Sequence, residues 1–280
     1  MKKICCIVNP VSGLKKSLKV FNEAKNLFEK SDFNTSLFVS EYPNHIKDYV
    51  SKIEKNRFDR IIVFGGDGSI NEVVNGLNDS NNLQSFKLGV IPTGSGNSVA
   101  HDTGLLEVKD AISKSLGDNI IKMDLNQVDF DSVSRLSVSV LGWGMFSYGN
   151  IRAEKLRLLG PIRYDVASII TLLEKKIHKA EVEVDGKLKL LECAFIVACN
   201  SKHTGKGMII APIGGFTDKK ITSEFFNSGN FFLSCKNLVL IWIFIAIVKI
   251  NINAIKFDDI TVTFRPRRPK SPVIINTEKK

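Results

Sequence analysis

The spacing of apolar residues changes abruptly after residue 64. Residues 61–64 form an uninterrupted apolar run, which is typical of a strand buried on both faces of a parallel sheet. The turn at 65–68, with the sequence GGDG, ends this run. Beyond it the apolar residues follow the spacing of one helix face: Ile70, Val73, Val74 and Leu77. The stretch therefore predicts a strand, a tight turn and a helix.

The same order of strand, turn and helix recurs in the first 120 residues. Apolar runs at 4–8, 37–39 and 88–91 predict further strands, each followed by a small-residue segment and a helical pattern. The first of these helices should turn Leu18, Phe21, Ala24 and Phe28 inward. Strands that alternate with helices predict a doubly wound parallel sheet of the α/β class with right-handed crossovers.

Three small-residue turns follow strands of this predicted sheet, at 9–13, 65–68 and 92–97. Ligands bind at the edge where the carboxyl ends of parallel strands meet. We therefore expect the three turns to converge on one site.

The pattern shifts toward strands after residue 120. Residues 181–190 alternate around an Asp-Gly pair and predict a β-hairpin, a helix is expected over about 162–176, and late strands are expected at 260–264 and 273–275. We place a boundary near Met123. The predicted units are an α/β domain over 1–123 and a β-rich, sandwich-like domain over 124–280.

The GGDG turn has the chemistry of a phosphate site. Glycines let the backbone approach a ligand closely, and the first N–H groups of the following helix have no intrahelical partner. The carboxylate of Asp67 would repel phosphate unless a metal ion or a reacting hydroxyl lay between them. Mg²⁺-dependent phosphoryl transfer supplies both. The alternative is a glycine-rich turn in which Asp67 only caps its helix.

Composition narrows the functional classes. The hydrophobic content of 44% indicates a globular protein, and five cysteines without CxxC spacing suggest reduced core residues of a cytoplasmic protein without a metal site. The net charge of +10 suits nucleic acid, an anionic membrane or a polyphosphate substrate. No nucleic-acid-binding motif accompanies the charge, so a nucleic-acid partner is not expected.

The eleven-residue apolar run at 238–248 is shorter than the roughly 20 residues that a transmembrane helix needs. It predicts a buried element. The alternative is the wall of a lipid pocket or a surface that dips into the membrane.

Together, an N-terminal NPVSG, GGDGSINEVVNGL and PTGSGNSVA make the sequence resemble the diacylglycerol kinase catalytic-domain superfamily of lipid kinases. Residues 40–45, SEYPNH, are similar to the TE-x-x-NH segment of its sphingosine and ceramide kinase branch. Trp143-Gly144 and the block EKLRLLG with Arg163 are similar to a further motif of that branch.

The resemblance implies an ATP-dependent lipid kinase that uses Mg²⁺ and transfers the γ-phosphate of ATP to a primary hydroxyl of a lipid. In this branch the acid at Asp67 is proposed to deprotonate the hydroxyl. The lipid head group would lie near Asn150. The positions implied for nucleotide binding are Asn9, Ser12, Gly13, Ser40, Gly65, Gly66, Gly68, Thr93, Gly94, Ser95, Arg157, Arg163 and Glu278.

Three departures from the family pattern concern this site. The first turn has Val11 where the pattern has a basic residue, although Lys15 and Lys16 follow closely. The family's late Asp-Gly-Glu corresponds to Asn276, Thr277 and Glu278, of which only the Glu is kept. The Asp-Gly expected after Pro212 is replaced by Asp218-Lys219.

Two competing functions remain open at this stage. A nicotinamide-nucleotide kinase would share the GGDG turn, and a catalytically impaired lipid-binding protein would explain the altered C-terminal motif. We also expect reversible association with anionic membranes, because basic residues cluster between 265 and 270. Finally, Asp67→Asn is expected to leave folding nearly intact.

Overall fold

The computed structural model describes residues 2–31, 33–130, 133–174, 176–184, 187–212, 215, 222–227, 252–257, 260–267 and 273–276. The apolar run at 238–248, the basic residues at 268 and 270, Asp218, Cys235 and Glu278 lie outside these ranges.

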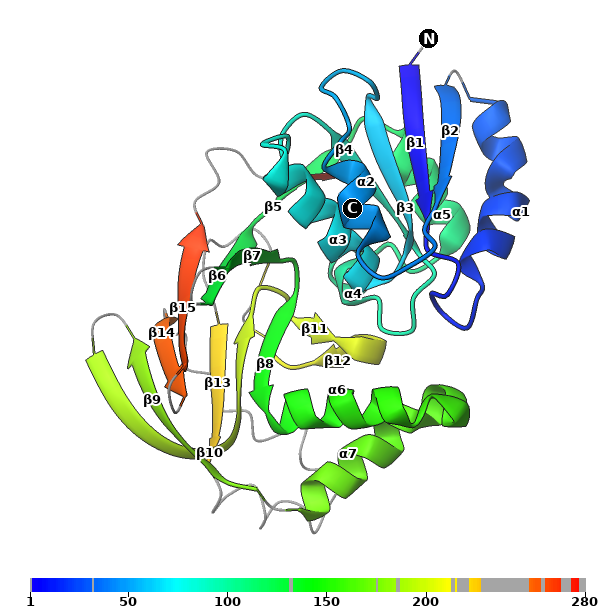
Figure 1. Ribbon diagram of the computed structural model, residues 1–280. Coiled ribbons are helices and arrows are strands. Elements are labelled where there is room, and N and C mark those ends of the chain that lie inside the picture. The colour runs from blue at the N-terminus through cyan, green and yellow to red at the C-terminus, as the bar shows by residue number, and fades with distance from the viewer. Residues whose placement is uncertain are drawn as a thin grey trace.

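A six-stranded sheet forms the N-terminal part of the molecule, in the order β2-β1-β3-β4-β16-β5 (Figure 1). The strands β2, β1, β3 and β4 run parallel, as the apolar runs predicted. The bounds are β1 (Lys2–Val8), β2 (Phe33–Val39), β3 (Arg60–Gly65), β4 (Lys87–Pro92), β5 (Ile120–Met123) and β16 (Val273–Asn276).

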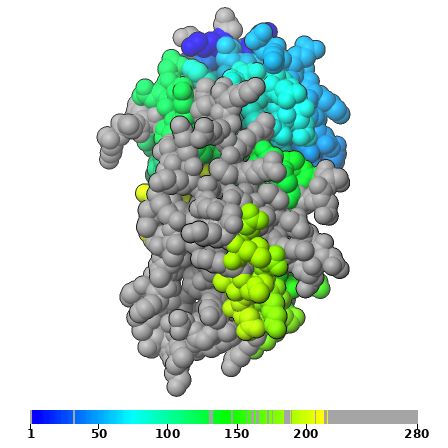
Figure 2. Space-filling model, turned by 90° about the vertical axis from the view of Figure 1, so that its left-hand side faces the viewer, coloured from blue at the N-terminus to red at the C-terminus, as the bar shows by residue number. Residues whose placement is uncertain are grey.

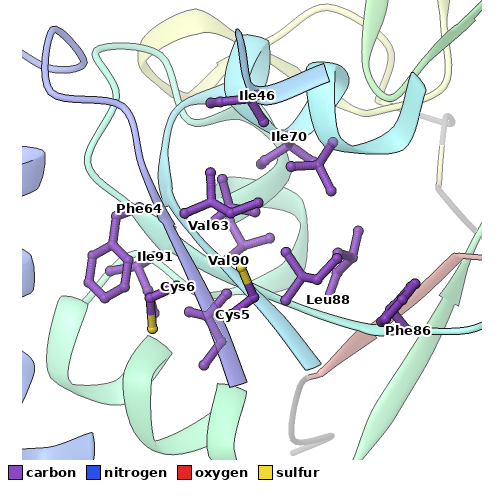
Figure 3. Close-up of a cluster of buried hydrophobic side chains, with 14 of the residues drawn as sticks. Cys5, Cys6, Ile46, Val63, Phe64, Ile70, Phe86, Leu88, Val90 and Ile91 are labelled. Carbon is purple, nitrogen blue, oxygen red and sulfur yellow. The ribbon is translucent and has the colours of Figure 1, made fainter. Parts of the chain in front are cut away.

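Helices cover both faces of this sheet. The rings of Phe21 and Phe28 on α1 (Ser17–Glu29) meet Phe64 of β3 at 5.4 and 6.0 Å between ring centroids. On the opposite side of β3, Val63 lies toward Ile46 of α2 (His45–Val50) and Ile70 of α3 (Asp67–Asp79), as Figure 3 shows. The prediction of a doubly wound sheet is therefore confirmed.

The chain leaves this sheet at Asp124 and enters a second, antiparallel sheet. Its order is β13-β10-β9-β14-β15-β6-β7, with β8 paired to β10. The bounds are β6 (Leu125–Phe130), β7 (Val133–Ser137), β8 (Val140–Gly144), β9 (His178–Val184), β10 (Lys187–Cys199), β13 (Thr222–Asn227), β14 (Ile252–Phe257) and β15 (Ile260–Arg267). The predicted hairpin is confirmed, because β9 and β10 pair from Val184 and Lys187 onward.

Five shorter elements lie outside the two large sheets. They are α4 (Ser98–Thr103), α5 (Val108–Leu116), the two-stranded sheet of β11 (His203–Thr204) and β12 (Met208–Ile209), and the 3₁₀ turn η2 (Gly205–Gly207) between those strands.

A helix pair follows β8. The pair consists of α6 (Met145–Lys155) and α7 (Arg163–Leu173), with the 3₁₀ helix η1 (Arg157–Ile162) between them. The sequence predicted only the second helix, over 162–176. Figure 2 shows the N-terminal residues at one end of the molecule and residues of β9 and β10 toward the other.

The strand β16 lies in the first sheet. Its residues Ile274 and Ile275 pair in parallel with β4, and Val273 to Asn276 pair antiparallel with β5. The division into residues 1–123 and 124–280 did not predict this return of the chain. The first sheet therefore includes a strand contributed from the end of the sequence.

Candidate active site

The turns after β1, β3 and β4 meet at the carboxyl edge of the first sheet. Gly13 has a φ of +53°, and a Cβ there would lie 1.7 Å from the carbonyl oxygen of Thr93. A Cβ on Gly94 would lie 2.4 Å from the Cα of Gly66. Side chains at these positions would displace backbone, so only glycines allow the turns to pack this closely. The predicted convergence of the three turns is confirmed.

Polar side chains fasten the first turn to the other two. The amide Nδ2 of Asn9 donates to Ser69 Oγ at 3.0 Å, and its Oδ1 accepts from the Val11 N–H at 3.2 Å. The hydroxyls of Ser17 and Thr93 are 2.7 Å apart and buried. The Thr93 N–H also donates to the Gly65 carbonyl at 3.1 Å. Hydrogen bonds thus link Asn9 to α3, and link Thr93 both to Gly65 and to the start of α1.

Asp67 is the first residue of α3, but its carboxylate binds another helix. Oδ2 accepts from the Ser98 N–H at 2.9 Å, and Oδ1 accepts from the Val99 N–H at 3.0 Å. These are first-turn N–H groups of α4, which lack intrahelical partners. Asp67 therefore caps α4 from outside, and Gly66 occupies the N-cap position of α3. A carboxylate offers about four lone-pair sites, so acceptor capacity remains on both oxygens.

This geometry changes one expectation from the sequence. An Asn at position 67 keeps one acceptor oxygen, but its NH₂ group would face a backbone N–H of α4. The loss of an N-cap acceptor costs about 0.5–2 kcal/mol. The structure therefore predicts that Asp67→Asn weakens folding measurably, a larger effect than the sequence alone leads us to expect.

Asn97 is a site residue that the sequence reading did not single out. Its Nδ2 donates to the Gly94 carbonyl at 2.8 Å, whereas its Oδ1 is buried without a hydrogen-bond partner among the described residues. That oxygen would lie 2.7 Å from a Cβ on Gly94, directly at the junction of the glycine turns. An unsatisfied buried acceptor costs about 1–3 kcal/mol, so a ligand donor here would relieve a real penalty. The feature of the sequence that could have identified Asn97 is its position as the last residue of the GSGN turn.

The remaining predicted positions of the turns differ in exposure. Ser40 is buried at the end of β2, where its N–H donates to the Val8 carbonyl at 3.0 Å. Ser12 begins the bend into α1, and its carbonyl accepts from the Lys16 N–H at 3.3 Å. Gly68 has no atom within 4 Å of an added Cβ, and Ser95 is exposed. Gly68 and Ser95 therefore face accessible space.

Three predicted positions lie on the helix pair instead of the turns. Asn150 is exposed on α6, and Arg157 begins η1. Arg163 begins α7, and its Nη2 lies 3.5 Å from Glu154 Oε1 on α6. In the view of Figure 1 the hairpin of β11 and β12 lies between α4 and α6. The predicted residue Glu278 is outside the described ranges.

The residues at the turns fit a nucleotide and the Mg²⁺ that accompanies it. Gly68, in the first turn of α3, has open space around it, so the backbone there is accessible to phosphate. The described residues contain no group of three or more His, Cys, Asp or Glu suited to a metal ion. Mg²⁺ in kinases commonly uses one or two carboxylates together with substrate phosphates and water. Such an ion would be held chiefly by the phosphates of the nucleotide and by water, so a dedicated metal cage is not required.

Comparison with known proteins agrees with this geometry. Residues 3–128 match the family described as "Diacylglycerol kinase catalytic domain". Residues 139–221 match the "YegS C-terminal NAD kinase beta sandwich-like domain". The resemblance to the diacylglycerol kinase catalytic-domain superfamily is thus confirmed over residues 3–128.

Two named relatives are lipid kinases. Sphingosine kinase 1 of Arabidopsis thaliana is 30% identical over 174 residues, which are 59% of this chain and 36% of that protein. Human ceramide kinase is 30% identical over 204 residues, which are 65% of this chain and 37% of that protein. The chain thus matches little more than a third of the length of either relative.

One solved structure supports the fold along the whole chain. A diacylglycerol kinase from Bacillus anthracis str. Sterne overlays with a TM-score of 0.70 at 17% identity, covering 99% of this chain and 97% of that one. At this level of identity the likeness concerns the fold. Both sheets therefore belong to a known two-sheet arrangement, an α/β sheet followed by an antiparallel β-rich region.

Proposed function

We propose that this protein is an ATP-dependent lipid kinase that transfers the γ-phosphate of ATP to a primary hydroxyl of a lipid. The observation that carries the proposal is the placement of Asp67 beside the glycine junction. A Cβ on Gly96 would lie 3.5 Å from Asp67 Oδ2, so the absence of that side chain keeps the carboxylate approachable. The lipid-kinase names of the relatives support the same activity.

The chain's own residues have distinct tasks in this reaction. Gly66 and Gly94 keep the two turns packed together, and the open space at Gly68 leaves room for the phosphates. The N–H groups at the start of α3 can donate to the phosphate oxygens. The Ser98 and Val99 N–H groups fix the orientation of Asp67. Asp67 takes the proton of the lipid hydroxyl, whose oxygen bonds to the γ-phosphorus while the bond to the β-phosphate oxygen breaks. Bound Mg²⁺ would supply charge neutralisation on the phosphate oxygens.

A membrane surface is the proposed source of the lipid. The helix pair exposes large apolar side chains, which soluble surfaces rarely gather in number: Ile151, Leu158, Leu159, Ile162, Ile169, Ile170 and Leu173. Leu158 is fully exposed. Arg152, Lys155 and Lys176 lie on or beside the same helices, and a basic residue near an anionic surface contributes about 1 kcal/mol of binding. We therefore propose peripheral, reversible membrane association of a cytoplasmic protein.

No helix in the described ranges has the length and apolar content needed to cross a membrane. Membrane association would accordingly be tested as surface binding. Pelleting with phosphatidylserine vesicles should decrease as salt rises, whereas Leu158→Asp should weaken binding at every salt concentration. If the amount of protein that pellets were the same with neutral and anionic vesicles and unchanged by Leu158→Asp, this part of the proposal would be contradicted.

The acceptor lipid is proposed from Asn150. An aspartate at this position would pair with the ammonium of a sphingoid base through a charge-assisted hydrogen bond, roughly twice as strong as a neutral one. Asn150 can bond only as an amide, which suits hydroxyl or amide head groups. We therefore propose that ceramide or diacylglycerol competes with sphingosine as acceptor.

A panel of acceptors tests the proposed reaction. Purified protein, Mg²⁺ and γ-labelled ATP would be incubated with sphingosine, ceramide, diacylglycerol or NAD⁺, and labelled products separated. Labelled lipid supports the proposal, and Asn150→Asp should shift the preference toward sphingosine. Labelling of NAD⁺ alone would indicate a nicotinamide-nucleotide kinase. Vesicle binding without any labelled product would indicate the impaired lipid-binding alternative.

A further inference from the structure

A buried carboxylate links α4 to the segment that starts at Lys202. The side chain of Asp102, in the last turn of α4, is 4% exposed. Its Oδ2 accepts from the Lys202 N–H at 2.7 Å, and its Oδ1 accepts from the His203 N–H at 3.2 Å. Oδ1 also contacts His203 Nδ1. Three contacts of one carboxylate therefore hold the start of β11, about 100 residues away in sequence.

The helix α4 is thus held by a carboxylate near each end. Asp67 binds the N–H groups of Ser98 and Val99 at its beginning, and Asp102 projects from its last turn onto β11. The helix has only six residues, Ser98–Thr103, so a shift at one end moves the other. A displacement of β11 would accordingly change the position of the N–H groups that orient Asp67.

The segment held by Asp102 lies directly on the GSGN turn. A Cβ on Gly96 would lie 3.2 Å from the Cα of Gly205 in η2. Gly207 has a φ of +75°, and a Cβ there would lie 2.6 Å from Cε1 of His101. The rings of His101 and His203 stack with centroids 5.5 Å apart. The glycines at these contacts let η2 lie close to the turn through Gly96 and Gly205, and close to α4 through Gly207 and His101.

We propose that Asp102 is a positioning residue for phosphoryl transfer. Through His203 it holds residues 202–207 against the Gly94–Asn97 turn, and it keeps α4 in the place where Asp67 is oriented. This role rests on the proposed lipid kinase function. A proton on Nδ1 of His203 lets the ring donate a hydrogen bond to the Asp102 carboxylate.

Two substitutions remove the contact, and a third conserves it. Asp102→Asn removes the charge and one acceptor, and His203→Ala removes the ring. His203→Asn can place its Nδ2–H where the ring Nδ1–H lies, while it lacks Nε2 altogether. Asp110→Asn is the matched control, because Asp110 pairs with Lys114 within α5 at 2.8 Å. The Asp110–Lys114 pair is partly exposed, and α5 takes no part in the contacts of Asp102 with Lys202 and His203.

Steady-state kinetics should distinguish a loss of positioning, which lowers kcat, from a loss of ATP binding, which raises KM. A misplacement of about 1 Å can reduce rate up to about 10²-fold, so kcat should fall about 10- to 100-fold in Asp102→Asn and His203→Ala while KM for ATP changes little. His203→Asn should recover most of kcat. If His203→Asn were as slow as His203→Ala, the ring Nε2 would be acting in the reaction, and the positioning role would be overturned.

Hydrogen exchange gives a readout that does not depend on kinase activity. Amides of residues 202–207 should exchange faster in Asp102→Asn than in wild type or Asp110→Asn, because their anchor is lost. Unchanged exchange there would overturn the proposal even if activity fell. Conversely, Asp102→Asn could show faster exchange while the wild-type protein labels no lipid. That result would support the role of Asp102 in holding residues 202–207 and would contradict the proposed kinase function.

Discussion

The side-chain amide of Asn75 hydrogen-bonds to both backbone groups of Leu136. Nδ2 donates to the Leu136 carbonyl at 2.8 Å, and Oδ1 accepts from the Leu136 N–H at 3.0 Å. Asn75 is in α3 and Leu136 is in β7, so the helix that begins with Asp67 is bonded directly to the second sheet. Asn71 adds a parallel contact, because its Oδ1 accepts from the Val138 N–H at 3.3 Å.

Asn75→Ala should lower the free energy of unfolding by about 2–6 kcal/mol, because it leaves two buried backbone groups unpaired at about 1–3 kcal/mol each. Urea denaturation of the purified variant measures this loss. Asn26→Ala, an exposed change on α1, is the control and should lie within about 0.5 kcal/mol of wild type. Equal stability of the two variants would mean that the Asn75 bridge contributes nothing.

Two glycines of the site, Gly94 and Gly68, should respond differently to alanine. Gly94→Ala places a Cβ 2.4 Å from the Cα of Gly66, and such overpacking costs typically about 1–3 kcal/mol. Gly68→Ala meets nothing within 4 Å, and alanine is favoured over glycine in a helix by up to about 1 kcal/mol. Thermal unfolding should therefore rank Gly68→Ala at or above wild type and Gly94→Ala well below it.

Gly68→Ala also tests the nucleotide assignment without a folding defect. A methyl group at the start of α3 would stand where the phosphates are proposed to approach. We expect ATP affinity, measured by calorimetry with a non-hydrolysable analogue, to fall about tenfold, equivalent to about 1.4 kcal/mol. Unchanged affinity would remove Gly68 from the nucleotide site.

The buried thiol of Cys5 should make stability depend on alkaline pH. Burial raises the pKa of Cys5 to about 11 from the ordinary value of 9.0. Because the folded state favours the protonated thiol, its contribution is fully present below pH 9 and is lost as the pH rises toward 11. One pKa unit is 1.36 kcal/mol, so up to about 2–3 kcal/mol is involved.

Cys5→Ala should reduce this loss of stability between pH 9 and pH 11 relative to wild type. Comparing the two proteins cancels the titration of the groups that they share, with the exception of Tyr49, whose pKa is raised by burial and by the neighbouring Cys5. Chemical denaturation at a series of pH values provides the measurement. Parallel curves for wild type and Cys5→Ala would contradict the raised pKa.

The local pattern was sufficient to predict the turns of the site. Within residues 61–77 the spacing of apolar residues changes from a continuous run to a helical pattern, with glycines between them. The strand, turn and helix could therefore be predicted without tertiary information. The helix α1 shows the limit of such a pattern. Leu18 was expected to face inward but is 37% exposed. Ser17 is buried instead, because its hydroxyl pairs with Thr93 across 76 positions.

Relationships between distant segments could not be predicted. Asp67 caps α4 across 31 positions, Asp102 holds His203 across 101, and β16 pairs with β4 from the end of the chain. A single sequence carries no periodicity that records which distant backbone group meets a carboxylate or which strand fills a sheet. The turns that form the proposed site could therefore be predicted from the sequence, whereas the long-range contacts that hold them could not.

Transfer of labelled phosphate from ATP to lipid by wild type and by Asp67→Asn tests the central claim most directly. The account predicts labelled lipid from wild type and a rate lower by about 10²–10⁴ for Asp67→Asn, because general-base catalysis is lost. The variant should still fold, with a stability loss of about 0.5–2 kcal/mol from the weakened cap of α4, so the assay is run below its unfolding transition. Near-normal turnover by folded Asp67→Asn would contradict the account.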